Sequence, residues 1–184
     1  MGEDGQVTEP TTPAPDAVRL SAAAREVEEY VAAGGWDQAP QLFALVPTDH
    51  LLREQPELAD RLDPSTAPLT PVAQDALEGD LGEALAAIMW PDAVAGCALA
   101  QEIVMLPPDA EAELPDSDAD AMGRVAAAHP QAREARLVAA VSRDGATACV
   151  LRLRTTTPDQ LDEVVEHPGL AKNLTAALLE TLRP

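Results

Sequence analysis

The chain has 184 residues, of which 46% are hydrophobic and only 2% aromatic, enough for one domain whose core is built from alanine, leucine and valine. Its 32 acidic and 12 basic residues give a formal net charge of −20, which argues against nucleic acid or a membrane as a partner. Because the chain shows no export signal, no apolar run of ~18 residues and only two cysteines, we expect a cytoplasmic protein with free thiols.

The first predicted element is a helix that follows an acidic, proline-rich leader. Residues 1–15 carry three prolines, three acids and no base, so we expect them to be disordered and dispensable, with a single domain over residues 16–184. Asp16 can cap a helix that Gly34 ends. The apolar stripe of this helix is Leu20, Ala23, Ala24, Val27, Tyr30 and Val31.

A strand and several helices are predicted next. The short apolar run 41–47 is typical of a strand, and Thr48 can cap a helical stretch that Pro56 interrupts. A Thr-Pro first turn and an Asp-to-Glu capping box predict two further helices, over residues 70–77 and 80–90.

The second half of the chain predicts longer strands. Residues 95–106 form a long strand pattern, which an acidic loop (107–120) and a helix (121–129) follow. Asp144-Gly145 is a preferred two-residue type I′ turn, which places Val138 opposite Leu151 in a hairpin. A closing helix carries the stripe Leu170, Leu174, Leu178 and Leu182.

These elements predict an α+β fold with an antiparallel sheet of about four strands and helices packed on it. The expected order is α-β-α-α-α-β-α-β-β-α.

The sequence assembles no catalytic or metal-binding constellation. Cys97 and Cys149 fall on apolar strand positions and no histidine is placed beside them, so we expect buried, unreactive thiols. The alternating aspartates of residues 116–120 lack the glycine and the glutamate of a calcium loop, and no phosphate loop or zinc spacing occurs. We therefore expect no catalytic residue, no metal, no cofactor and no enzymatic activity.

One charged feature stands out against the acidic background. Five arginines fall within 22 positions that hold only two acids: Arg133, Arg136, Arg143, Arg152 and Arg154. In the predicted register, Arg152 and Arg154 share a face with Leu137 and Val150, while Arg136 points to the other face. These arginines either protect a strand edge, or pair with the acidic loop, or form a binding spot made of Arg152, Arg154, Leu137 and Val150.

Three long stretches resemble a known family when taken together. They are "GGWDQAPQLFALVPTDHLL", "MWPDAVAGCALAQEIVMLPPDAE" and "RLVAAVSRDGATACVLRLR". In this order they resemble a family of small acidic proteins of high-GC Gram-positive bacteria that has no assigned function, over roughly residues 18–184. The element order is also similar, more loosely, to the type III secretion chaperone-like fold, whose members bind proteins and often dimerise. Neither resemblance implies catalytic residues.

The sequence therefore favours a non-catalytic cytoplasmic module that binds another protein or forms a homodimer. The alternative is a small-molecule-binding protein or a hydrolytic enzyme with a pocket near Trp36, Trp90 and the arginine-rich hairpin. An enzyme should show a concave site where polar side chains converge, whereas a binding module should show an exposed apolar groove or face.

Overall fold

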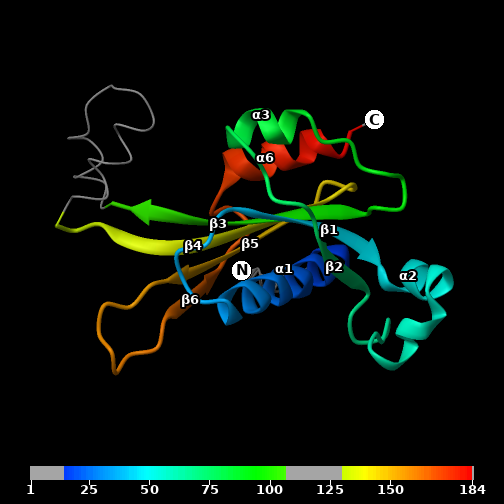
Figure 1. Ribbon diagram of the computed structural model, residues 1–184, viewed down its shortest axis with the longest axis horizontal. Helices are drawn as coiled ribbons and strands as arrows, with labels where there is room; N and C mark the ends of the chain where they lie inside the picture. Colours follow the sequence, from blue (N-terminus) through cyan, green and yellow to red (C-terminus); the bar gives the residue numbers. More distant parts are fainter. Residues whose placement is uncertain (1–14, 107–129, 184) are drawn as a thin grey trace, which may run out of the picture.

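The computed structural model describes residues 15–106 and 130–183, which form a sheet with helices on both faces. The strands are antiparallel neighbours in the order β2-β1-β3-β4-β5-β6, and Figure 1 shows α1 on one face and α3 with α6 on the other. The elements are α1 (Pro15–Ala33), β1 (Gln41–Pro47), α2 (Thr48–Glu54), the 3-10 helix η1 (Pro56–Asp60), β2 (Leu69–Ala73), α3 (Leu81–Ala86), β3 (Gly96–Met105), β4 (Arg133–Ser142), β5 (Thr147–Leu153), β6 (Glu163–Glu166) and α6 (Lys172–Thr181). The α+β class is confirmed.

Helix α1 covers one face of the central strands. Its stripe is buried as predicted, except for Tyr30, which is 63% exposed. Small side chains on the facing strands let the helix approach closely: Ala98, Ala100, Ala140 and Ala148. Burial of the larger members, Leu20 and Val27, stabilises this layer by roughly 1.5–3 kcal/mol each.

The opposite face is covered by α6 and α3. Leu178 and Leu182 of the predicted closing stripe are buried there against Cys97 and Leu99 of β3. The prediction is wrong for Leu170, which precedes α6 and is 39% exposed. Helix α3 begins at the predicted cap, since the Asp80 side chain accepts a hydrogen bond from the backbone N–H of Glu83 (3.0 Å). It ends earlier than predicted, at Ala86.

The prediction of a helix over residues 70–77 is wrong, because Leu69–Ala73 is the edge strand β2. The Thr48 hydroxyl does not cap α2. It donates to the carbonyl oxygen of Ala67 and lies 2.8 Å from the Thr70 hydroxyl, which holds Thr70 beside β1. Even-numbered residues of β2 bond to β1, so Pro71 lies where its missing N–H would face solvent, the position in a sheet that tolerates proline.

The second strand that the sequence did not predict is β6, Glu163–Glu166, at the other edge. It pairs with β5 from Val150 to Leu153. Four residues flanked by glutamates carry too little apolar pattern to be recognised as a strand. With β2 and β6 the described sheet has six strands instead of about four, and the predicted element order is wrong at both places.

The predicted hairpin register is wrong by one residue. Val138 pairs with Val150 instead of Leu151, because the turn holds three residues, Arg143 to Gly145, instead of two. The N–H of Gly145 donates to the carbonyl oxygen of Ser142 (2.9 Å), and Gly145 has a φ of 94°. This is the three-residue turn that ends in a left-handed glycine. A shift of one residue moves every side chain of one strand to the other face.

Several predictions fall outside the described residues. They are the disorder of residues 1–14, the acidic loop and the helix over 107–129, and the side chain of Asp16. The strands predicted over 41–47 and 95–106 are confirmed as β1 and β3.

The start of β3 depends on a glycine. A Cβ atom at Gly96 would lie 2.3 Å from the backbone carbonyl oxygen of Val141 on the neighbouring strand β4. Because the obstacle is backbone, no side-chain rotation relieves it. Gly96 therefore sets how closely β3 and β4 approach at this end.

We predict that Gly96→Ala lowers the free energy of unfolding by about 1–3 kcal/mol, since the added methyl group forces two central strands apart. Chemical denaturation of the full chain measures this. Gly82→Ala is the matched control, because a Cβ there meets only a side-chain oxygen of Asp80 and alanine favours the helix. Equal stability of the two variants would contradict the close approach at Gly96.

Candidate functional site

The predicted binding spot on the hairpin is not assembled as expected. Leu137 faces α6, whereas Val150 is buried under α1, so the two lie on opposite faces of the sheet. Arg136 pairs directly with Arg152 and shares its face, contrary to the expectation that it points away. Arg136 and Arg152 lie on strands that have a neighbour on each side, so the edge-protection interpretation is wrong for these two arginines.

Arg152 is held by a carboxylate of α1. Its Nε and one terminal nitrogen donate to the two oxygens of Glu28, the second at 2.9 Å. The Glu28 side chain is 3% exposed and the Arg152 side chain 22%. These hydrogen bonds raise the pKa of Arg152. The pair fastens α1 to β5, and the Arg152 guanidinium is engaged in it.

Arg136 and Arg154 contact the same indole ring. Their guanidinium carbons lie 4.5 Å and 5.3 Å from the centre of the Trp36 ring, within the range of a cation–π interaction. Arg154 also bonds to Glu134 (2.8 Å) and Asp37 (3.3 Å). Arg136 is 1% exposed and donates to the carbonyl oxygen of Gly35, and its Nε has no hydrogen-bond partner among the described residues.

The turn that carries Trp36 is fixed by hydrogen bonds. Glu102 on β3 accepts from the backbone N–H groups of Asp37 (2.7 Å) and Gln38 (2.5 Å). Gly35 and Asp37 have φ angles of 83° and 65°, a left-handed turn that follows the end of α1. Arg136 on the Gly35 carbonyl therefore places a cation at the negative end of the helix, which is stabilising.

Arg143 works at the other end of the sheet. It donates to the carbonyl oxygens of Val94 (2.7 Å) and Leu182 (2.5 Å), which joins the entry of β3 to the end of α6. Of the five arginines singled out in the sequence, Arg136, Arg152 and Arg154 therefore lie together on the α1 face of the hairpin. Arg143 lies at the far end of the sheet, so the five do not form one patch.

The two thiols are buried and free. Burial raises the pKa of Cys97 to about 11, and burial also raises the pKa of Cys149. His167 does not activate Cys149 through the contacts seen here: its Nδ1 accepts from the N–H of Gly169 (2.9 Å), while the sulfur of Cys149 lies 3.9 Å from the carbonyl oxygen of Pro168. Neither thiol has the setting of a nucleophile.

The pocket proposed around both tryptophans does not form. Trp36 lies on the α1 face with Arg136, whereas the Trp90 indole N–H donates to the Thr181 hydroxyl (2.9 Å) of α6 on the opposite face. A hollow of about 330 Å³ between α1, β5 and the end of β6 contains Ser21, Arg25 and His167. Arg25 is bonded to Glu166 across it (2.5 Å), and the hollow is also lined by Cys149, whose pKa is raised by burial.

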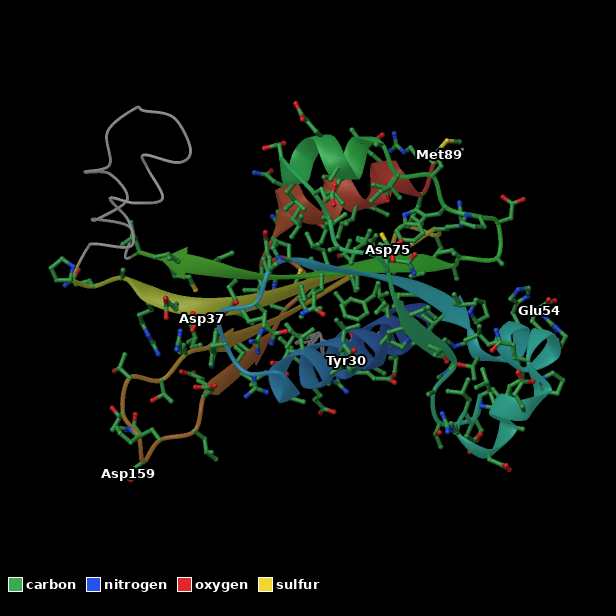
Figure 2. The ribbon with its side chains drawn as sticks, in the orientation of Figure 1. Tyr30, Asp37, Glu54, Asp75, Met89 and Asp159 are labelled. Carbon is green, nitrogen blue, oxygen red and sulfur yellow. The ribbon has the colours of Figure 1, made fainter. Side chains whose placement is uncertain are left out.

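A smaller hollow combines aromatic, apolar and acidic side chains. The Tyr30 hollow, of about 200 Å³, lies between α1 and the edge of the sheet and is lined by Glu26, Val27, Tyr30, Phe43, Pro71 and Ala73. The Tyr30 ring meets the Phe43 ring edge-on, with centres 5.9 Å apart and planes at 86°. Figure 2 labels Tyr30 on α1. The sequence pattern missed this site because it counted Tyr30 as core.

The angular positions of the residues around α1 could have identified the Tyr30 site from the sequence. At 3.6 residues per turn, Tyr30 and Glu28 fall about 80° to either side of Leu20. Both are therefore at the margins of the buried stripe. The Glu28 side chain faces β5, where it accepts hydrogen bonds from Arg152. The Tyr30 side chain faces β1 and the edge strand β2.

We predict that native Cys97 and Cys149 react with a thiol reagent such as DTNB far more slowly than the same residues in denaturant, because both are buried and their pKa values are raised. Stopped-flow absorbance measures both rates. Fast labelling of Cys97 alone would restore it as a candidate nucleophile.

We also predict that Glu28→Gln lowers the free energy of unfolding by about 3 kcal/mol, because it leaves the partly buried Arg152 charge without its carboxylate. Glu134→Gln is the control, since it removes an exposed partner of Arg154 and should have a much smaller effect. Denaturation of both variants gives the comparison. Similar losses would contradict a special role for the Glu28–Arg152 pair.

Comparisons with known proteins identify a family and no activity. None of the helices in the described part of the chain is both long and apolar enough to cross a membrane, and no group of three or more potential metal ligands occurs among the described side chains. No curated protein and no solved structure matched the chain. Residues 20–183 match the family described as "PPA1309-like protein", a description that names no substrate or partner. The match spans most of the sequence, and the chain therefore belongs to the PPA1309-like protein family.

Proposed function

We propose that this protein is a non-catalytic module that binds another protein through the Tyr30 hollow. The observation that carries the proposal is the exposure of Tyr30, the only tyrosine of the chain, directly over the buried ring of Phe43. An aromatic side chain that is mostly exposed yet anchored on a second ring is typical of the residues that dominate protein interfaces.

The surroundings of Tyr30 support side-chain docking. Pro71 and Ala73 extend the apolar wall from the helix onto the edge strand β2. Met89 (91%) and Leu161 (97%) are more exposed than Tyr30, but neither lines one of the two hollows, and single exposed apolar side chains are common on protein surfaces. The hollow therefore joins exposed apolar surface to a concave shape.

The edge strand itself is poorly suited to strand addition. The odd-numbered residues of β2 point their backbone N–H and C=O groups away from β1, toward the free edge of the sheet. The middle residue of these three is Pro71, which has no N–H to donate to an added strand. A partner at this edge is expected to contact side chains instead of extending the sheet.

The lack of an enzymatic role is part of the proposal. It is supported by the buried thiols with raised pKa values and by the separation of Trp36 from Trp90, which removes the pocket on which the enzyme alternative was based. Action in the cytoplasm, dimer formation and likeness to a secretion chaperone stay predictions from the sequence.

Site-specific photo-cross-linking tests the binding surface. We predict that p-benzoylphenylalanine in place of Tyr30 captures a discrete partner in cells, because this side chain lies at the centre of the interface. The same group at Met89 or Leu161, which are more exposed than Tyr30 but lie elsewhere, should not capture that partner. Mass spectrometry identifies the joined segments.

A Tyr30→Ala variant completes the test. It should lose the partner in co-purification while Met89→Ala retains it, with melting temperatures close to wild type because both side chains are exposed. Equal capture from all three positions, or retention of the partner by Tyr30→Ala, would contradict the proposed surface.

A further inference from the structure

The two carboxylates that precede Tyr30 on α1 form no hydrogen-bonded ion pair with the described residues. Glu26 and Glu29 lie on the exposed side of α1, one turn before Tyr30 and directly before it. Their neighbour Arg25 does not neutralise them, since it is bonded to Glu166 (2.5 Å). Glu26 lines the hollow, and Glu29 lies close enough to Glu26 on the outer side of α1 to repel it, so the rim of the hollow is acidic on the helix side.

From this arrangement we propose that the segment bound at the Tyr30 hollow is basic. An arginine or lysine of the partner lays its aliphatic stem over the apolar floor and its charge between Glu26 and Glu29. This inference rests on the proposed function and adds the chemical class of the partner.

The floor and the rim of the hollow each fit one part of such a side chain. Phe43, Pro71 and Ala73 offer carbon to the methylene stem, which long cationic side chains bury readily. The face of Tyr30 can accept the cation, and the molecule already uses this pairing where Arg136 and Arg154 contact Trp36. An acidic or neutral segment would leave the negative charge of these carboxylates without a counter-charge.

The electrostatics of Glu26 agree with a cationic ligand. Partial burial, and then repulsion by Glu29, raise the pKa of Glu26. A positive charge placed between the two carboxylates offsets both effects. Gln substitutions at these positions remove repulsion in the free protein, so they should not lower its stability.

A second copy of the chain is a poor occupant. Each copy carries a formal net charge of −20, which opposes approach of two acidic surfaces. A basic segment of a different protein is attracted by the same charge, with a dependence on ionic strength. The net charge therefore favours a partner of opposite sign.

NMR titration of the isotope-labelled full chain tests the inference. The ligand is the peptide acetyl-Ala-Leu-Arg-Ala-Lys-Leu-Ala-amide, and its uncharged analogue has citrulline for arginine and norleucine for lysine. We predict shifts at Tyr30, Val27 and Ala73 with the basic peptide, and a dissociation constant that rises roughly fivefold for each of Glu26→Gln and Glu29→Gln. Control variants Glu54→Gln and Glu57→Gln, in the exposed α2 and η1 region, should bind as wild type.

Several results would overturn the basic partner. They are absence of shifts at the hollow, equal binding of the uncharged peptide, unchanged binding by the Glu26 and Glu29 variants, or equal binding of spermidine, which would indicate a free polycation. Cross-links from position 30 to a second copy of the chain would also overturn it. If position 30 captures a partner while both peptides bind alike, the binding surface stands and the basic partner fails. If only the basic peptide binds and position 30 captures nothing, the proposed function fails.

Discussion

The exposed surface around Tyr30 depends on how α1 is oriented about its own axis. The bidentate pair between Glu28 and Arg152 fixes one margin of the helix on β5, while the alanines of the facing strands fix its distance from the sheet. With that margin fastened, the opposite margin carries Tyr30 to the edge of the sheet, over Phe43. The buried ion pair thus serves orientation more than stability, since an apolar pair of similar size could stabilise a core equally well.

The same helix organises the loop that follows it. Its C-terminal end is joined to Trp36 by a left-handed turn, and Glu102, Arg136 and Arg154 hold that turn on the sheet. Four of the five arginines singled out in the sequence are therefore bound to groups of the same molecule: Arg136, Arg143, Arg152 and Arg154. The acidic side chains that remain unpaired near Tyr30 then give that margin of α1 its sign.

Much of the fold could be predicted from the sequence, because long apolar patterns report burial directly. The strands β1 and β3, the stripe of α6 and the Asp80 cap follow from local residues alone. The strand β2 could not be predicted in this way, because a Thr-Pro pair is compatible with a helix start and with an edge strand. The contact that holds Thr70 in the sheet is made with Thr48, which is distant in the sequence. The hairpin register was mispredicted for a similar reason. Asp-Gly fits turns of two or three residues, and a shift of one residue places Arg136, instead of Leu137, on the same face as Arg152. The pattern assigns Tyr30 to the core because it cannot resolve the margins of a stripe. The structure shows that the sheet ends at β2 and that residues 15–106 and 130–183 leave Tyr30 63% exposed.

Fluorine NMR on the full chain tests the exposed setting of Tyr30 most directly, since the chain has a single tyrosine and 3-fluorotyrosine gives a single signal. The measurement is the relaxation of that signal in the presence of a soluble gadolinium chelate, with the unfolded chain as the reference for full exposure. With Tyr30 63% exposed, we predict relaxation enhancement close to that reference, and its loss when the partner binds. A signal that the chelate leaves nearly unchanged in the free protein would place the ring in the core and contradict the orientation of α1.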